Sequence, residues 1–338
     1  MKIVLDTLGG DLGYKEHVAG AIEALKLKED FSVILVGIKE ELEAELALYS
    51  YDKSRIEVVG CTETITCEDA PMEAIRKKKD SSVVVAYKLL KEQEDCSALV
   101  STGSTGAVLA GGIFKLGRIK GLSRPSLGPL IPTLRGGKVM LTDSGANVDC
   151  KPINLVQFAI MASSYMKNVC GIENPRVALL SNGTEDAKGC ELTKEVFKLL
   201  SNTPNINFVG NMEAREIVSG NYDVVVADGF HGNIALKGLE GGAKVVTTLL
   251  KEGIKSSFMA KIGYLFMKKL IGGMKEKIDF NKIGGAVFMG LEKIVIKAHG
   301  ASDRDCITKC IMQATEAVDK GVVEAIKQGI SQLDLKDE

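Results

Sequence analysis

Short runs of β-branched residues alternate with longer amphipathic segments along most of this chain, and this alternation constrains the fold most strongly. The runs Lys2–Asp6, Val33–Gly37, Lys138–Asp143, Arg176–Ser181 and Asp223–Asp228 are apolar over most of their length. Strands that are apolar on both faces belong to parallel sheets covered by helices on each side. The sequence therefore predicts a Rossmann-like three-layer α/β/α fold with a mostly parallel sheet.

The remaining elements are predicted from the spacing of apolar residues. Further strands are expected at Arg55–Val59 and Ala98–Ser101. Two prolines in Gly128–Thr133 suit either an edge strand or a loop. Helices are expected at Val18–Leu27, Glu40–Leu48, Pro71–Lys79, Ser81–Lys91 and Ala107–Leu116.

The segment Leu249–Ile283 interrupts this alternation. It predicts an inserted helical pair near the C-terminal third, followed by a final strand pair and a C-terminal helix. No linker rich in proline, glycine or serine divides the chain. Residues 1–338 are therefore expected to form a single α/β/α domain with a helical protrusion at about 249–283.

The composition argues against several classes of protein. A net charge of −1 gives no overall attraction for nucleic acid, so any charged partner must meet a local patch. Eight scattered cysteines without a C-x-x-C pair, and only three histidines, favour free thiols over disulfides or a zinc site. The opening MKIVLDTLGGD predicts a strand rather than a signal peptide, and no apolar run is long enough to span a membrane. We therefore expect a cytoplasmic protein that holds no metal.

Polar turns follow the predicted strands, at the end of a parallel sheet where ligands bind. The first turn contains Gly9, Gly10 and Asp11. Its adjacent glycines suit either a close approach of the backbone to a ligand or a plain tight turn.

The second turn lies between a strand and a helix and consists of Thr102, Gly103, Ser104, Thr105 and Gly106. Hydroxyls, flexible backbone and a helix N-terminus together favour a bound phosphate or carboxylate. Ordinary capping of the helix by Ser104 or Thr105 is the alternative. The P-loop sequence and the dinucleotide fingerprint are both absent from the chain, so no cofactor is expected.

Three later turns carry carboxylates, amides, lysines and a histidine. The fourth turn could instead be a solvated loop. In the fifth turn, a carboxylate at the end of a strand is followed by histidine and asparagine, which favours a functional site. The candidate residues are Asp143, Asn147, Asp149 and Lys151 in the third turn, Asn182 and Lys188 in the fourth, and Asp228, His231 and Asn233 in the fifth.

Other reactive side chains receive weaker assignments. His17 falls within a predicted helix, and we expect it to lie at the surface. His299 follows a predicted strand and suits a structural role. Cys150 and Cys190 have no histidine beside them in the sequence, which leaves a thiolate nucleophile without support.

At these five turns, and along almost its whole length, the chain resembles the bacterial phosphate acyltransferases of phospholipid synthesis. The resemblance implies transfer of a fatty acyl group from acyl carrier protein to inorganic phosphate, giving acyl phosphate. It also implies a homodimer that associates peripherally with membranes. The matching stretches are Leu5–Asp11, Ala74–Ser82, Thr102–Ala107, Leu116–Gly121, Asp143–Pro152, Leu155–Ala159, Lys188–Glu195, Asp228–Asn233, Ile283–Ala286 and Ile294–Gly300.

Three stretches depart from the family pattern. Leu12-Gly13-Tyr14 stands where the family usually has His-Ala-Pro, which removes that histidine as a catalytic candidate. Ser104 replaces the usual asparagine of the second turn. Ser181–Thr184 replaces Asn-Ile-Gly-Glu in the fourth, which weakens the assignment of Asn182.

The implied reaction is attack by a phosphate oxygen on a thioester, and it needs alignment more than a strong base. Thr102–Gly106 would hold the phosphate, while Lys188 and Asn182 steady the phosphate or the thioester oxyanion. His231 would protonate the departing thiolate. The carboxylates expected to orient these donors are Asp143, Asp149 and Asp228.

Three alternatives remain open at this point. The first is a short-chain phosphate acetyl- or butyryltransferase acting on coenzyme A thioesters, separable by the choice of donor. The second is a decarboxylating dehydrogenase related in fold, which would need a dinucleotide site. The third is a membrane scaffold without catalytic activity.

The stretch Ile254–Lys277 holds six lysines and one glutamate, with apolar residues near helical spacing. A core or dimer-interface helix with its lysines outward is one interpretation. Docking on an anionic membrane is another, and the same lysines also suit acidic acyl carrier protein. The candidate contact residues are Lys261, Leu265, Phe266, Lys268 and Lys269.

Overall fold

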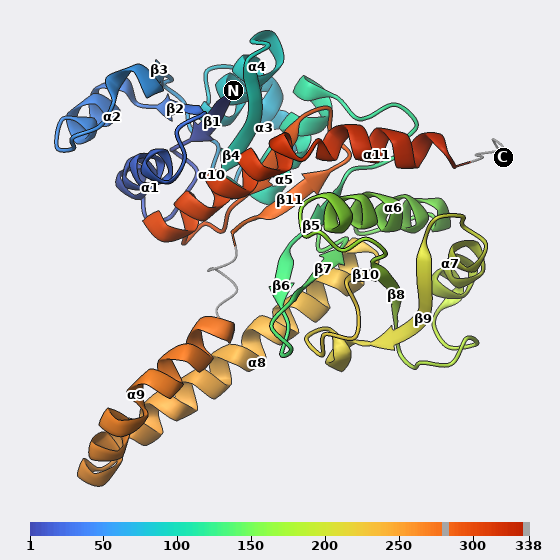
Figure 1. The fold of residues 1–338 in the computed structure, drawn as a ribbon. Coiled ribbons are helices and arrows are strands. Elements are labelled where there is room, and N and C mark those ends of the chain that lie inside the picture. Colours follow the sequence, from blue (N-terminus) through green and yellow to red (C-terminus); the bar gives the residue numbers. More distant parts are fainter. Residues whose placement is uncertain (279–283, 334–338) are drawn as a thin grey trace.

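The computed structural model describes residues 1–278 and 284–333 and contains two sheets (Figure 1). The first has the strand order β3 (Ile56–Gly60), β2 (Ser32–Gly37), β1 (Lys2–Asp6), β4 (Cys96–Ser101), β12 (Ile294–Lys297), β11 (Ala286–Met289) and β5 (Ser126–Gly128). The second has the order β6 (Leu130–Pro132), β7 (Lys138–Thr142), β10 (Val224–Val226), β8 (Arg176–Ser181) and β9 (Asn207–Glu213).

Both sheets are mostly parallel. In the first sheet only the pairings made by β11 are antiparallel, and in the second only the pairing of β6 with β7 is. The helices that accompany them are α1 (Tyr14–Leu27), α2 (Lys39–Leu46), α3 (Pro71–Lys77), α4 (Ser82–Glu92), α5 (Thr105–Gly111), the π-helix η2 (Gly112–Leu116), α6 (Pro152–Asn168), α7 (Glu191–Ser201), α8 (Gly229–Lys255), α9 (Phe258–Ile278), α10 (Arg304–Asp319) and α11 (Val322–Ser331). Two short 3₁₀ turns complete the set, η1 (Lys53–Arg55) and η3 (Ala214–Glu216).

Alternate residues of each strand face opposite helical layers, as the apolar strands predict. In β1, Ile3 and Leu5 pack with α1 and α10, whereas Val4 between them packs with α4 and α5. In the second sheet, Val224 and Val226 of β10 face α6, and Val225 faces the start of α8. The α/β/α class predicted from sequence is therefore confirmed.

The chain forms two sheets where the apolar pattern predicts one. Leu127 in β5 at the edge of the first sheet and Leu130 in β6 at the edge of the second are separated by Pro129 and one glycine. Proline has no N–H to continue a ladder, so the chain changes sheets there. The ambiguous segment Gly128–Thr133 thus forms an edge strand, and periodicity alone does not reveal which strands pair.

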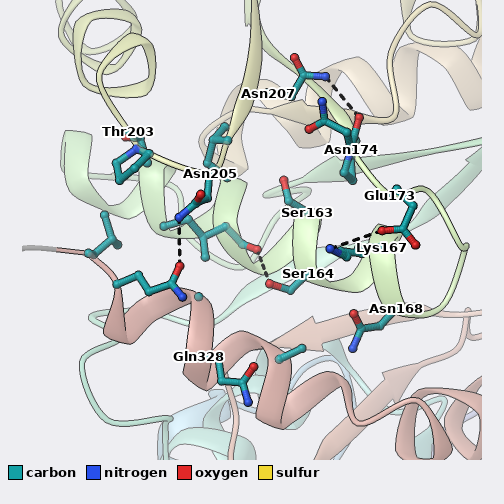
Figure 2. Close-up of a pocket in the computed structure, with 18 residues that line it drawn as sticks. Ser163, Ser164, Lys167, Asn168, Glu173, Asn174, Thr203, Asn205, Asn207 and Gln328 are labelled. Atoms are coloured by element: carbon teal, nitrogen blue, oxygen red, sulfur yellow. Dashed lines mark hydrogen bonds and ion pairs between the residues drawn. The ribbon is translucent and has the colours of Figure 1, made fainter.

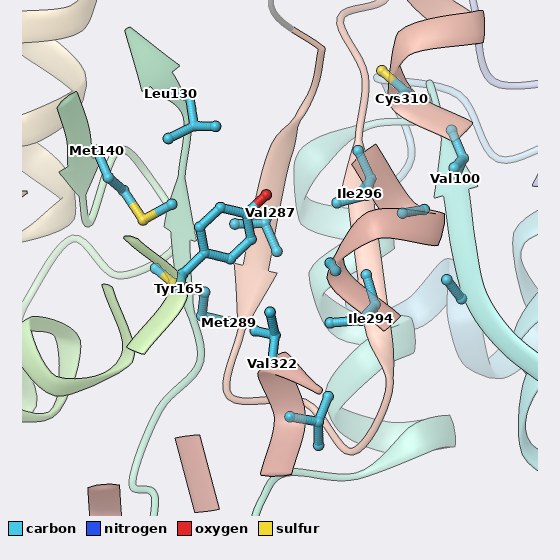
Figure 3. Packing of buried hydrophobic residues seen from close by; sticks show 14 of the residues in the cluster. Val100, Leu130, Met140, Tyr165, Val287, Met289, Ile294, Ile296, Cys310 and Val322 are labelled. Atoms are coloured by element: carbon cyan, nitrogen blue, oxygen red, sulfur yellow. The ribbon is translucent and has the colours of Figure 1, made fainter. Parts of the chain in front are cut away.

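One apolar cluster joins the two sheets. Tyr165 on α6, Met140 on β7 and Val287 on β11 lie together in it, with Val322 of α11 beneath them (Figure 3). All four side chains are at most 1% exposed. The sheets therefore share a core rather than burying two separate ones.

The predicted helical insertion is present over its described residues as a hairpin of α8 and α9 that projects away from the sheets, and residues 279–283 of the predicted range lie outside the described part of the chain (Figure 1). Helix α8 begins at Gly229, well before Leu249, because Asp228 caps it by accepting hydrogen bonds from the first free N–H groups. The predicted C-terminal helix is instead the pair α10 and α11. Gly321 divides them, and its φ of 60° is a conformation that glycine adopts readily.

Candidate active site

The first two turns lie against each other at the carboxyl ends of β1 and β4. A Cβ on Gly9 would lie 2.3 Å from the backbone nitrogen of Gly103, so the backbones touch and only glycine fits. Asp11 donates its N–H to the carbonyl of Gly300, 2.8 Å away, which brings the end of β12 to the same place. Gly9, Gly10 and Asp11 thus form a single polar surface with Thr102–Gly106.

A buried carboxylate holds this surface from below. The Ser101 hydroxyl donates to Asp6 Oδ2 at 2.6 Å and accepts the N–H of Gly103 at 3.0 Å. Ser104 caps α5 by accepting the N–H of Ala107 at 3.3 Å. The structure therefore shows the capping role of Ser104, and the N–H groups of Gly103 and Ala107 are both used within the turn.

His17 is buried, not at the surface as its place in a helix suggested. Its Nδ1 lies 2.9 Å from the carbonyl of Gly13 and its Nε2 lies 2.9 Å from Thr102 Oγ1. A carbonyl only accepts, so Nδ1 carries the proton and Nε2 accepts the hydroxyl of Thr102. The side chain of Thr102, expected to hold phosphate, is thus engaged with His17. Val18 and Ala21, which lie one and four positions after His17, are buried too. The helical spacing of these apolar residues could therefore have placed His17 on the buried face of the helix.

Lys297 was not among the candidates either, although it lies within the matched stretch Ile294–Gly300. It is the last residue of β12 and donates to the carbonyls of Thr102 and Ala298. Burial lowers its pKa, against the opposing effect of nearby groups that include Asp6 and Asp11. The amino group of Lys297 therefore lies directly beneath the second turn.

Acid is expected to destabilise the protein through His17, because burial lowers the pKa of this side chain. In the unfolded chain His17 has its ordinary pKa of about 6.5 and binds a proton more tightly than in the folded protein. The free energy of unfolding therefore decreases as the pH falls from about 6.5 toward the lower pKa that His17 has in the folded protein. Relative to a His17→Gln variant, the wild type should lose up to about 1.4 kcal/mol per pH unit in this range. Urea unfolding at several pH values between 8 and 5 measures this, and parallel curves for the two proteins would contradict it.

The third turn is built around Asp143, which is fully buried. One of its oxygens accepts the N–H groups of Leu127 and Ala146 at 2.9 and 3.1 Å. The other accepts both the N–H and the side-chain amide of Asn147, at 2.7 and 2.9 Å. Burial raises the pKa of Asp143 and these hydrogen bonds oppose that shift. Asp143 and Asn147, expected near substrate, thus bind each other and shape the loop, whereas Asp149 and Lys151 are exposed.

The fifth turn lies directly on the third. A Cβ on Gly232 would lie 1.9 Å from the carbonyl oxygen of Asp143, and Gly229 donates its N–H to the carbonyl of Asn147 at 2.8 Å. Asn233 is exposed and approaches Gly145, whose added Cβ would lie 3.6 Å from the Asn233 amide carbon. The start of α8 is therefore fixed by backbone contacts with the third turn.

Asp228 and His231 form a hydrogen-bonded pair at this helix start. His231 Nδ1 lies 2.6 Å from Asp228 Oδ2, while the other carboxylate oxygen accepts the N–H groups of Phe230 and His231. The carboxylate accepts, so Nδ1 bears a proton and the ring orientation is fixed. Asp228 is buried and His231 is exposed, which leaves Nε2 facing outward from the turn.

The fourth and fifth turns line one cavity of about 400 Å³. Asn182, Asp228 and His231 all border it, with Ile234 and Ala235 supplying apolar wall. Three of the four predicted catalytic residues are thus brought together.

Lys188 lies beside this cavity rather than in its wall. A Cβ on Gly183 would lie 2.9 Å from Lys188 Cγ, so the lysine stem crosses the fourth turn at that glycine. Asn182 and Lys188 are both exposed at this rim.

A second cavity, of about 480 Å³, lies away from the turns, between α6, α11 and the segments that precede β8 and β9 (Figure 2). Asn205 and Asn207 line it with Gln328, and Lys167 pairs with Glu173 at its edge. None of the site residues predicted from sequence borders it. The polar turns and this amide-lined cavity are therefore separate features.

Solved structures with a similar fold cover almost the whole chain. A phosphotransacetylase from Streptococcus pyogenes covers 97% of this chain and 94% of its own at a TM-score of 0.58, with 19% identity. A branched-chain phosphotransacylase from Enterococcus faecalis V583 covers 94% and 99% at a TM-score of 0.57, with 14% identity. At such identities the likeness shows the fold alone.

The sequence comparisons define the family. Residues 1–325 match the model described as fatty acid synthesis protein. A phosphate acyltransferase of Alkaliphilus oremlandii (strain OhILAs) is 47% identical over 333 residues, 98% of each chain, and one of Clostridioides difficile (strain 630) is 46% identical over 331 residues, 98% of this chain and 96% of its own. The chain belongs to this family, the phosphate acyltransferases, and the resemblance seen in the sequence is confirmed.

Proposed function

We propose that the enzyme transfers a fatty acyl group from acyl carrier protein to inorganic phosphate, forming acyl phosphate for phospholipid synthesis. The observation that carries this proposal is the cavity shared by the fourth and fifth turns, where Asn182 meets the oriented pair of Asp228 and His231. The core shared by both sheets supports one catalytic domain over residues 1–338.

The proposed chemistry uses these residues without a covalent enzyme intermediate. A phosphate oxygen forms the bond to the thioester carbon, and the carbon–sulfur bond breaks. Asn182 and Lys188 stabilise the oxyanion, and the second turn, with Lys297 beneath it, holds the phosphate. His231, held by Asp228, delivers a proton from Nε2 to the departing thiolate.

The choice of donor tests this assignment against the coenzyme A alternative. Thiol release should depend on phosphate, with a higher kcat/KM for a long-chain thioester of acyl carrier protein than for acetyl- or butyryl-coenzyme A. The reverse order would favour the short-chain reaction.

We further propose that the enzyme is a cytoplasmic homodimer that binds anionic membranes through α9. No helix in the described part of the chain is long and apolar enough to cross a bilayer. Phe258, Leu265 and Phe266 are 70 to 86% exposed on α9, with Lys261, Lys268 and Lys269 exposed among them. Apolar side chains with flanking lysines suit a helix lying in the interface of an anionic membrane.

The neighbouring helix supports the dimer. Val245, Val246 and Leu249 are 58 to 63% exposed on α8, and a second copy would cover this apolar surface. Beyond the start of α8 the hairpin projects away from both sheets, so a buried core helix does not describe α9 (Figure 1).

Neutralising Lys261, Lys268 and Lys269 to glutamine should weaken binding to anionic vesicles by about two orders of magnitude, at roughly 1 kcal/mol per lysine. Sedimentation with vesicles of phosphatidylglycerol and phosphatidylcholine measures the change. Lys194→Gln with Lys198→Gln on α7 is the control. Unaltered vesicle binding in the triple variant would exclude α9 as the membrane contact.

A further inference from the structure

A hollow lined by lysines lies between α4 and η2, on the face of the first sheet covered by α3, α4 and α5. Its volume is about 400 Å³. One glutamate, Glu92, and one exposed aromatic ring, that of Phe114, are also in its lining. The lysines of the hollow are Lys79, Lys88, Lys91 and Lys115.

These four lysines form no ion pair with any carboxylate in the described part of the chain, whereas their neighbours do. Lys77 pairs with Glu73, and Lys78 pairs with Asp69 at 2.7 Å. A chain with net charge −1 thus presents four unpaired cations around a single opposing carboxylate. Phe114 is 51% exposed at the same place, so the hollow combines positive charge with an apolar anchor.

The hollow is connected to the second turn by one continuous helical segment. Helix α5 begins at Thr105 beside that turn and runs into η2, which carries Phe114 and Lys115. Nine residues separate Thr105 from Phe114, a rise of about 14 Å at helical spacing. The start of α3 also packs against the second turn, because a Cβ on Gly106 would lie 2.7 Å from the Pro71 side chain.

We propose that this lysine hollow is the docking surface for acyl carrier protein, an acidic protein that delivers its acyl chain on a long flexible prosthetic arm. The inference rests on the proposed function. Docking here places the carrier about one helix length from the second turn, where the phosphate is proposed to bind, while its acidic surface faces the lysines. Complementary charge speeds such an encounter and fixes its orientation.

The lysine hollow is a less suitable membrane-binding surface than α9. A lipid surface is broad, and α9 offers several large exposed apolar side chains, among them Phe258, Leu265 and Phe266. The hollow offers one, Phe114, in a concave setting. Carrier and membrane therefore bind separate surfaces, so that the enzyme can accept its donor while attached to the bilayer.

Charge reversal of Lys88 and Lys91 to glutamate tests the docking surface. Steady-state kinetics should show a KM for the acyl carrier protein thioester about tenfold or more above wild type, with kcat within about twofold. The KM for a small acyl-pantetheine thioester should stay unchanged, because that donor has no acidic surface. The control reverses Lys194 and Lys198 on α7, two exposed lysines away from the hollow, and should match wild type.

The alternatives give different readouts. An unchanged KM for the carrier thioester, or an equal rise with the pantetheine donor, would overturn the docking surface. Loss of vesicle binding in the Lys88/Lys91 variant, with carrier kinetics intact, would assign the hollow to lipid instead. If the wild type shows no phosphate-dependent turnover, the proposed function is wrong. Fluorescence anisotropy of labelled carrier protein tests docking independently of turnover. Docking at the hollow predicts binding that the Lys88/Lys91 variant weakens and the Lys194/Lys198 control leaves unchanged.

Discussion

Replacement of Lys188 by alanine is expected to lower turnover on the order of a hundredfold or more. The fourth turn carries Lys188 across Gly183 to the rim of the cavity that Asn182 and His231 line. Removal of a hydrogen-bond donor that stabilises the negative charge of the transition state lowers kcat by an amount of this order. The loss should appear in kcat as well as in kcat/KM, since the interaction is made mainly in the transition state.

A matched control separates this effect from a general loss of surface charge. Lys194 lies six residues further on, exposed on α7, and alanine there should leave turnover unchanged. Both variants should unfold at the wild-type urea concentration, because both side chains are exposed. Turnover of the Lys188 variant within twofold of wild type would remove this lysine from the site.

Replacement of Gly232 by alanine is expected to abolish activity and to destabilise the protein by about 3 kcal/mol or more. The added Cβ would lie 1.9 Å from the backbone oxygen of Asp143, far inside contact distance. That oxygen belongs to a loop held by four hydrogen bonds to the Asp143 side chain, so neither partner yields easily. The fifth turn must then move away from the third, and Asp228 and His231 move with it.

Gly238 provides the control in the same helix. A Cβ there meets no atom within 4 Å, so alanine should be neutral or should stabilise α8 by up to about 1 kcal/mol. Urea unfolding and turnover should be measured for both variants. Equal stability of the Gly232 and Gly238 variants would show that the two turns are not in the contact described.

Much of the fold follows from sequence because its physical causes are local. The apolar runs that become β1, β2 and β8 are buried on both faces, and burial on both faces is what their composition predicts. The division into two sheets depends on which strands pair across long separations, and no periodicity encodes that. Strand β9 was missed because its seven residues, NFVGNME, mix polar and apolar side chains without a clear run.

The sequence predicts where the candidate site lies but not its internal contacts. The turns that follow the predicted strands single out Thr102, Asp143 and Asp228 in the sequence. Their partners come from elsewhere in the chain, as with His17, which reaches Thr102 across 85 residues. Asp143 was expected to orient substrate-binding groups, and its four hydrogen bonds instead satisfy the backbone and amide of its own loop and of β5. Such long-range pairings require the fold.

Formation of acyl phosphate by the polar turns is tested most directly by a trapping experiment. Purified protein is incubated with an acyl carrier protein thioester, with and without inorganic phosphate, and hydroxylamine is added to trap activated acyl groups. We expect acyl hydroxamate that requires phosphate and forms in proportion to the thiol released. Thioester consumption that proceeds equally without phosphate and yields only free fatty acid would contradict it.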